Sequence, residues 1–302
     1  MDSPSRARRQ RRRKRTLVQL LKTGPQSMSF WTDVLAFCES TTERTGERLL
    51  RDFGTVPASR KADGSLVTRS DTWADRTIRE AIASTFPDHG VLTEEREHVY
   101  QDREWCWVVD PIDGTTNFTR GVPMWATSLG LLHRGTPVFG YVHVPPVRQT
   151  FHGYWSGSTG LDMRRGAYCN GEPIRSSAEA LSDHQFISLC SRSSRVLRHA
   201  LPCKVRMLGA ATCNLLGVAS GAMLGAIEKT PKIWDVAGVW AIVQAAGGIW
   251  INLGRDPQFP LEPGRDYGAR SYPTLALASN DLRAHLEPLV RSAFGGETSP
   301  SP

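Results

Sequence analysis

Apolar side chains recur at helical spacing in two segments near the start of the chain. In residues 30–53 the apolar positions fall three and four residues apart, and Gly54 follows as a stop signal. Residues 71–86 show the same period, with Asp71 at their beginning and Pro87 directly after the last apolar residue. The pattern predicts a pair of amphipathic helices that each turn one face to a core.

Strands are predicted next, because the apolar positions become continuous or alternate. Residues 105–109 form an unbroken apolar run, which is typical of a strand buried on both faces. Residues 126–133 and 137–144 flank a short polar turn and predict an antiparallel hairpin. Residues 148–153 and 164–169 continue the β character, so this part of the chain is expected to form an antiparallel sheet.

The second half of the chain alternates between the two patterns. The predicted strands are residues 186–190, 248–253 and 274–278, and the predicted helices are residues 211–223, 235–246 and 280–294. Asp235 is expected to begin the middle helix. Periodicity alone therefore predicts an α+β half followed by an α/β half.

Two halves and two short extensions are expected along the chain. Residues 28–165 are the expected N-terminal α+β half and residues 166–296 the expected C-terminal α/β half, while residues 1–27 and 297–302 are expected to be disordered. With 302 residues, of which 40% are hydrophobic, the chain can bury a sizeable core. Because no apolar run reaches about 18 residues, no membrane-spanning helix is predicted.

The net charge of +7 comes from the beginning of the chain. Residues 1–27 hold nine basic side chains and one acid, a net charge of +8, which leaves −1 for the remainder. Such a tail could bind nucleic acid, so a nucleic-acid-binding regulatory protein is kept as a hypothesis of another class. The alternative is an extension without a role, upstream of a true start at Met28. No exposed aromatics alternate with basic residues as stacking on bases requires, which argues against nucleic acid as a partner.

The six cysteines are scattered and include no Cys-x-x-Cys pair. This arrangement matches neither a zinc site nor a disulfide framework. Reduced thiols and a cytoplasmic location are therefore predicted.

The strongest chemical signal is the segment DPIDGTTNF at residues 110–118, which directly follows the predicted strand 105–109. Two carboxylates at the end of a buried strand are costly unless a cation joins them. Gly114, Thr115 and Thr116 add a flexible turn and main-chain N–H groups of the kind that bind phosphate oxygens. Although Asp-x-x-Asp-Gly is also ordinary turn chemistry, the combination predicts metal-assisted attack on a phosphate ester.

Four segments together resemble the inositol monophosphatase family. They are residues 110–118, WDVAG at 234–238 with AAGG at 245–248, KADGSLVTRSD at 61–71, and the acidic pair at 94–95. Their order and spacing fit the family over about residues 30–295. The resemblance implies a layered αβαβα sandwich, a Mg²⁺-dependent phosphatase that is inhibited by Li⁺, and a homodimer.

The resemblance also implies a set of metal ligands. They are the carboxylates of Glu94, Asp110, Asp113 and Asp235 and the main-chain carbonyl of Ile112, holding two or three Mg²⁺ ions. Glu94 is expected to help hold the attacking water as well, and it follows Thr93 where many relatives have glycine. Glu95 and Glu97 are instead expected to be solvated.

A proton-accepting pair is implied by the same resemblance. Asp71 is expected to bind the hydroxyl of Thr115, and the pair takes the proton of the attacking water, so Asp71, Thr115 and Glu94 are the expected catalytic residues. Asp71 could equally be only a helix cap, as could Asp235. Lys61 is expected to offset the excess negative charge, while Gly114, Thr115 and Thr116 bind the phosphate.

Residues further along the chain are expected to select the substrate. Gly209, Ala210 and Ala211 match a segment that lies against the substrate ring in the family, and Ser191 matches another substrate loop loosely. Glu228 matches an acid that accepts hydrogen bonds from ring hydroxyls, although a carboxylate also suits an amine. The predicted substrate is myo-inositol 1-phosphate, with histidinol phosphate, fructose 1,6-bisphosphate and a 3′-phosphonucleotide as alternatives.

Overall fold

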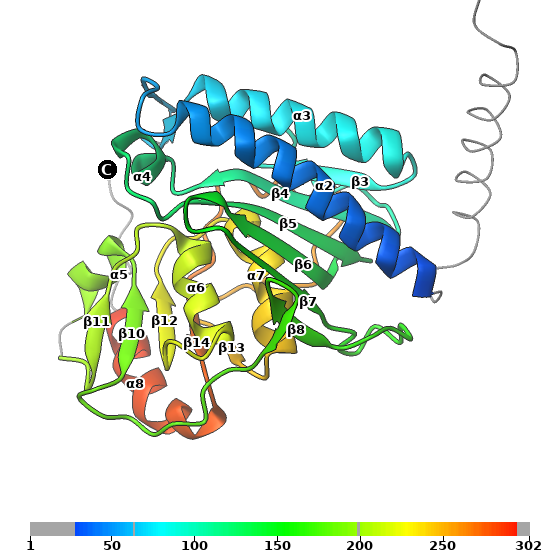
Figure 1. Cartoon of the computed structure of the whole chain (residues 1–302). Coiled ribbons are helices and arrows are strands. Elements are labelled where there is room, and N and C mark those ends of the chain that lie inside the picture. The colour runs from blue at the N-terminus through cyan, green and yellow to red at the C-terminus, as the bar shows by residue number, and fades with distance from the viewer. Residues whose placement is uncertain (1–27, 63, 198–199, 295–302) are drawn as a thin grey trace, which may run out of the picture.

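The structure, a computed structural model, describes residues 28–62, 64–197 and 200–294 (Figure 1). The expected extension at residues 1–27 and the expected tail at residues 297–302 lie outside the described residues. Within the described ranges, the search for a helix both long and apolar enough to span a bilayer found none.

Seven α-helices and two sheets make up most of the described chain. The helices are α2 (Met28–Asp52), α3 (Arg69–Thr85), α4 (Thr115–Arg120), α5 (Ser191–Val196), α6 (Ala211–Ala219), α7 (Ile233–Ala245) and α8 (Arg283–Phe294), with 3₁₀ turns η1 (Pro145–Val147) and η2 (Asn280–Leu282). The larger sheet has the order β3-β4-β5-β6-β7-β8-β9, formed by β3 (Gly90–Thr93), β4 (Trp105–Asp113), β5 (Ala126–His133), β6 (Thr136–Val144), β7 (Gln149–Tyr154), β8 (Gly166–Cys169) and β9 (Glu172–Ile174). The smaller sheet has the order β11-β10-β12-β14-β13, formed by β10 (Phe186–Leu189), β11 (Lys204–Arg206), β12 (Gly225–Glu228), β13 (Ile249–Asn252) and β14 (Thr274–Leu277). A short ribbon pairs β1 (Ser59–Arg60) with β2 (Leu66–Val67).

Helices and sheets alternate in layers, which confirms the predicted αβαβα sandwich. Helices α2 and α3 cover one face of the seven-stranded sheet (Figure 1). Helices α6 and α7 lie between the other face of this sheet and the five-stranded sheet. Helices α5 and α8 pack against strands β12 and β14 of the smaller sheet. The predicted antiparallel hairpin is also confirmed, as β5 and β6.

Strand β4 contains a continuous apolar run because both of its faces are covered. Trp107 and Val109 face the core beneath α2 and α3, where Ile78 also packs. Cys106 and Val108 face the core shared with α6 and α7. Because alternate side chains of a strand point to opposite faces, a strand covered on both sides needs apolar residues at every position.

Strand β3 was not predicted, and it positions one acid of the site. It runs parallel to β4, with Thr93 opposite Val109. Parallel neighbours end at the same edge of a sheet, so Glu94 and Asp110 emerge side by side. The N–H of Glu94 donates to the carbonyl of Val109 at 3.2 Å, which holds the two strand ends together.

Glycines on three neighbouring strands let α7 lie directly on the larger sheet. A Cβ at Gly130 of β5 would lie 2.8 Å from the main-chain nitrogen of Gly238 in α7, and one at Gly153 of β7 would lie 2.8 Å from the α7 backbone. A Cβ at Gly140 of β6 would overlap the carbonyl of Gly238. This close packing sets the start of α7, which carries Asp235, against the sheet that carries the other acids.

The expected starts of two helices are wrong, because α3 and α7 each begin two residues before the acid that was expected to cap them. Thr68 caps α3, and its hydroxyl accepts from the N–H of Ser70 at 3.0 Å. Asp71 occupies the third helical position and accepts from the N–H of Thr68 at 2.7 Å. In α7, Asp235 has the corresponding place and accepts from the N–H of Lys232 at 2.8 Å. Each acid therefore sits inside its helix and reaches back to the preceding residue.

Other element boundaries also differ from the expected ones. The helix predicted for residues 211–223 ends at Ala219, and Gly221, with φ +75°, turns the chain toward β12, a strand that was not predicted. The strand predicted for residues 105–109 continues to Asp113. Strands β8 and β9 lie beyond the expected boundary at residue 165 and still belong to the seven-stranded sheet.

Candidate active site

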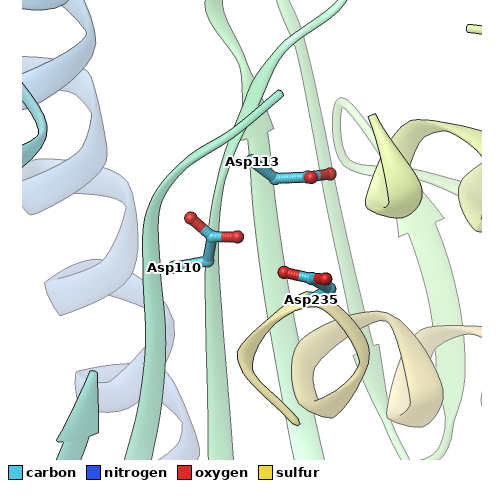
Figure 2. Close-up of side chains that lie close together, drawn as sticks. All are labelled: Asp110, Asp113 and Asp235. Atoms are coloured by element: carbon cyan, nitrogen blue, oxygen red, sulfur yellow. The ribbon is translucent and has the colours of Figure 1, made fainter. Parts of the chain in front are cut away.

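Three carboxylates from two elements converge at the end of β4. Asp110 and Asp113 extend from β4 and Asp235 from the first turn of α7, and Figure 2 shows the three side chains pointing toward one another. One oxygen of each carboxylate lies within 4.8 Å of the others. Asp110 and Asp113 are buried, whereas Asp235 is half-buried. We refer to these three residues as the acidic cluster.

An irregularity in the sheet brings both β4 carboxylates to the same side. Residues three apart in a regular strand point to opposite faces. The pairing of β4 with β5 shifts register between Asp110 and Asp113, which removes this constraint. The N–H of Ile112 donates to Oδ1 of Asp110 at 3.0 Å and fixes the turn between the two acids.

The electrostatics of the acidic cluster fit a divalent cation. Burial raises the pKa of Asp110 well above its usual range, and the charges of Glu94, Asp113 and Asp235 raise it further. The pKa of Asp235 is raised in the same way, by burial and then by Asp113 and Glu94. For Asp113 burial again raises the pKa, against the effect of hydrogen bonds from Thr212. A cation bound by carboxylate oxygens, as Mg²⁺ is in proteins, would remove this repulsion.

Glu94 lies beside the acidic cluster, and its carboxylate is bound to Lys61. Lys61 Nζ lies 2.9 Å from Glu94 Oε1 and 2.6 Å from Glu95 Oε1. Burial raises the pKa of Glu94 to about 7, although Lys61 opposes the shift. Burial alone would lower the pKa of Lys61, but the two glutamates outweigh it and raise that pKa. The contact confirms the expected charge balance by Lys61.

The expectation of a solvated Glu95 is wrong. Its side chain is only 9% exposed and forms the shorter of the two ion pairs of Lys61. Glu97 is exposed, as expected. The difference arises because Lys61, more than thirty residues away in sequence, folds onto the loop after β3 and bridges the two neighbouring glutamates.

The structure brings Asp71 and Thr115 together. The hydroxyl of Thr115 lies 3.2 Å from Asp71 Oδ1 and 3.2 Å from the carbonyl of Ile112. The second oxygen of Asp71 accepts from the N–H of Thr68 at 2.7 Å and from its hydroxyl at 2.6 Å. Burial raises the pKa of Asp71, while the hydrogen bonds from Thr68 and Thr115 lower it, and burial prevails.

The start of α4 lies directly after the acids of β4. Gly114 precedes the helix with φ +89°, a conformation that favours glycine, and a Cβ there would lie 3.0 Å from the Cβ of Ala210. Thr115 and Thr116 form the first turn, whose N–H groups have no carbonyl partner within the helix. Because Thr116 lines the neighbouring cleft, these donors are placed beside a ligand space.

An open cleft of about 560 Å³ connects the acidic cluster with the C-terminal half. It is lined by Asp113 and Asp235 and by all five residues that were predicted to contact the substrate, namely Ser191, Gly209, Ala210, Ala211 and Glu228. Thus the fold gathers at one cleft predicted site residues from five separate places in the sequence.

Asn214, a polar residue that the sequence did not single out, lines the same cleft. Asn214 Nδ2 donates to Oε1 of Glu228 at 2.6 Å, and Glu228 is buried. Burial raises the pKa of Glu228 well above its usual range, and the thiol of Cys190 raises it further, while Asn214 lowers it. The sequence offered one signal for Asn214: it is a polar side chain within a helix, residues 211–219, that consists mostly of small and apolar residues.

Asn117 connects the two halves of the chain next to the site. Its Nδ2 donates to the carbonyls of Met124 and Leu208, both at 2.7 Å. Gly209 lies against it with φ +83°, and a Cβ there would stand 2.7 Å from the amide of Asn117. This contact fixes the segment Gly209 to Ala211 beside α4, a connection that the sequence did not predict.

Comparisons with known proteins identify the family of this chain. The family model described as "Inositol monophosphatase family" matches residues 31–287. The chain is 32% identical over 223 residues to a "Fructose-1,6-bisphosphatase/inositol-1-monophosphatase" of Aquifex aeolicus, covering 69% of this chain and 81% of the relative. The solved IMPase of Thermotoga maritima superimposes with a TM-score of 0.72 at 26% identity, covering 87% of this chain and 98% of that one.

A further solved structure shares the fold at lower identity. It is an IMPase/NADP phosphatase complexed with Mg²⁺ and phosphate, with a TM-score of 0.68 and 20% identity over 94% of this chain and 98% of its own. The layered fold and the acidic cluster thus define a phosphatase of the phosphoric monoester hydrolase class. The family match across most of the chain shows that this protein belongs to the inositol monophosphatase family, as its four motifs indicated.

Proposed function

We propose that the protein is a Mg²⁺-dependent phosphomonoesterase that hydrolyses the phosphate ester of a small polyol. The observation that carries this proposal is the single cleft that joins Asp113 and Asp235 to Glu228. A polyol phosphate needs positive charge at its phosphate end and hydrogen-bonding groups at its hydroxyl end. The acidic cluster fits the first need through a bound cation, and Glu228 fits the second.

The proposed metal ligands extend the acidic cluster. They are the carboxylates of Glu94, Asp110, Asp113 and Asp235 and the carbonyl of Ile112. Bound Mg²⁺, in two or three ions, would supply the positive charge that offsets the phosphate and acidifies water. Lys61 contacts only Oε1 of Glu94, so Oε2 is proposed to bind the cation.

Asp71 and Thr115 are proposed to accept the proton of the attacking water. The hydroxyl of Thr115 donates to Asp71 at 3.2 Å, so its lone pairs remain available to a water molecule. The carboxylate of Asp71 can accept the proton in turn, and its raised pKa favours that step. The N–H groups of Gly114, Thr115 and Thr116 are proposed to hold the phosphate oxygens during attack.

The hydroxyl end of the substrate is proposed to contact the C-terminal half. Asn214 and the thiol of Cys190 both contact the carboxylate of Glu228, and the remaining lone pairs of this carboxylate are proposed to accept from a substrate hydroxyl. Gly209, Ala210 and Ala211 are proposed to leave space for a ring, and Ser191 also lines the cleft. Within this class, myo-inositol 1-phosphate is the proposed substrate, and fructose 1,6-bisphosphate, histidinol phosphate and a 3′-phosphonucleotide are the alternatives.

Replacement of one cluster acid tests the proposal. Phosphate release from myo-inositol 1-phosphate with Mg²⁺ is measured for the wild type, for Asp113→Asn and for Asp33→Asn, a matched control on the exposed face of α2. We expect Asp113→Asn to lower kcat/KM at least about a hundredfold and Asp33→Asn to change it less than about twofold, with equal helix content by circular dichroism. Wild-type turnover by Asp113→Asn would rule out the metal assignment.

Two further properties belong to the proposal. Li⁺ should inhibit the reaction, because it is a small cation that competes for oxygen ligands. The protein should form a homodimer, which light scattering of the full chain would detect.

A further inference from the structure

His98 contacts two segments that each carry a proposed metal ligand. It lies in the loop that follows β3, and its Nε2 lies 2.8 Å from the main-chain carbonyl of Glu94. Because a carbonyl oxygen only accepts, Nε2 carries the proton and donates. The ring of His98 also stacks on Trp234 of α7, with centroids 5.3 Å apart and an interplanar angle of 28°. Trp234 directly precedes Asp235, so one side chain connects the loop of Glu94 to the helix of Asp235.

The main chain of Glu94 is held at both of its polar groups. Its N–H donates to the carbonyl of Val109 at 3.2 Å, and its carbonyl accepts from His98. The N–H of Thr93 donates to the carbonyl of Glu97 at 2.9 Å and closes the same loop. These bonds fix the point at which the side chain of Glu94 leaves the chain beside the acidic cluster.

A segment of the C-terminal half packs against the same imidazole. The N–H of Tyr267 donates to the carbonyl of His98 at 2.9 Å. A Cβ at Gly268 would lie 2.7 Å from Nδ1 of His98, so a larger residue there would displace the ring. Lys232 Nζ donates to the carbonyl of Gly268 at 3.0 Å, and the N–H of Lys232 donates to Asp235 at 2.8 Å. The contacts that hold His98 therefore lead back to Asp235.

Glu94 depends on such support more than the other proposed carboxylate ligands do. Asp110 and Asp113 belong to β4 and Asp235 to α7, whereas Glu94 follows the last residue of β3 and lies in a loop. A ligand on a loop is placed less precisely than one on a strand or helix. Hydrogen bonds from neighbouring groups supply this precision, and their loss weakens metal binding.

We propose that His98 is a positioning residue of the metal centre, whose hydrogen bond holds Glu94 where it can share a cation with the acidic cluster. The stack on Trp234 and the contact with Gly268 keep the imidazole in place for this bond. The inference rests on the proposed function, because it takes Glu94 as a ligand of the cation.

Calorimetric titration with Mg²⁺, without substrate, tests this role in the wild type, His98→Phe, His98→Gln and His285→Gln. Phenylalanine keeps a ring that can stack on Trp234 and removes the donor. Glutamine removes the ring and keeps an N–H donor at a similar distance from the main chain. His285 is the matched control, because it is exposed on α8 and its Nδ1 lies 3.4 Å from the carbonyl of Asp281, again four residues earlier.

His98→Phe should weaken Mg²⁺ binding about tenfold, with an unchanged circular dichroism spectrum. His98→Gln should stay within about threefold of the wild type, and His285→Gln should bind Mg²⁺ as the wild type does. Because the bond acts through Glu94, the losses should not add. Glu94→Gln/His98→Phe should therefore bind Mg²⁺ within about twofold of Glu94→Gln alone.

The same titrations separate this inference from the proposed function. Wild-type affinity in His98→Phe, equal losses in His98→Phe and His98→Gln, or additive losses with Glu94→Gln would each overturn the positioning role, even in an active phosphatase. If no phosphomonoester is hydrolysed but Mg²⁺ affinity follows the expected order, the proposed function falls and the positioning role stands. A wild-type protein that binds no Mg²⁺ would overturn both.

Discussion

Thr212 binds one carboxylate oxygen of Asp113 through two groups at once. Oδ2 of Asp113 accepts from the N–H of Thr212 at 2.7 Å and also from its hydroxyl. The N–H of Ala211 adds a contact of 3.3 Å to Oδ1. Asp113 belongs to the larger sheet and Thr212 to α6, so a helix of the C-terminal half fixes the orientation of an acid of the N-terminal half.

The variant Thr212→Val tests this orientation, because valine keeps the shape of threonine and removes the hydroxyl donor. We expect the Mg²⁺ concentration that gives half-maximal activity to rise about fivefold and the free energy of unfolding to fall by about 1–2 kcal/mol. Thr212→Ser keeps the hydroxyl and should retain the wild-type Mg²⁺ dependence. A Thr212→Val enzyme with an unchanged Mg²⁺ dependence would show that the hydroxyl has no part in positioning Asp113.

Lys61 is expected to stabilise the metal-free protein. Lys61→Met leaves Glu94 and Glu95 without a partner in a largely buried place, which should cost about 3 kcal/mol of unfolding free energy without metal. Mg²⁺ should recover more of this loss in the variant than it adds to the wild type, because a cation can replace the ammonium group. Urea unfolding with and without Mg²⁺ measures the difference.

The pair of Arg79 and Asp75, at 2.9 Å on α3, provides the control for this experiment. Arg79→Met also leaves a buried acid without its cation, yet Mg²⁺ should not recover its loss. If Mg²⁺ stabilised the Lys61→Met and Arg79→Met variants equally, the claim that a bound cation replaces the ammonium group of Lys61 would be excluded.

His152 should make the protein less stable in mild acid. It stacks between Tyr141 and Tyr168, with ring centroids 6.4 Å and 4.8 Å away. Burial, and then the charge of Arg164, lower the pKa of His152 to about 4. The unfolded chain has a pKa of about 6.5 at this position and therefore binds more protons between pH 4 and 6.5. Stability should fall as the pH drops through this range, by up to about 3 kcal/mol.

His152→Phe keeps an aromatic ring in this stack and removes the titration. Urea unfolding at pH 7 and pH 5 should show a smaller loss of stability in the variant than in the wild type. The same pH dependence in both proteins would exclude His152 as the source.

Most of the elements and site residues that could be predicted follow from residues that lie near one another in the sequence. The apolar periods identify α2, α3 and the strands β4 to β7, because each of these elements covers several turns or repeats. The segment 110–118 contains two acids and the phosphate-binding turn within nine residues. The Thr68-Arg-Ser-Asp71 pattern of a capping box was also in the sequence, but the preference of aspartate for helix caps obscured it.

The remaining features depend on contacts between distant segments. Strands β3 and β12 have four residues each, too few to show a period. The bridge from Lys61 to Glu95, the support of Asp113 by Thr212 and the contact of Asn214 with Glu228 are set by how the layers pack. No local pattern encodes such contacts.

The central claim is that carboxylates from β4 and α7 form one metal centre that drives phosphate-ester hydrolysis. The most direct test is a Mg²⁺ titration of the wild type and of Asp235→Asn, in which binding by calorimetry and phosphate release are recorded at each concentration. The account predicts that binding and activity saturate together in the wild type, and that Asp235→Asn loses both while keeping its circular dichroism spectrum. Wild-type activity that persists in excess EDTA, or full activity in Asp235→Asn, would contradict it.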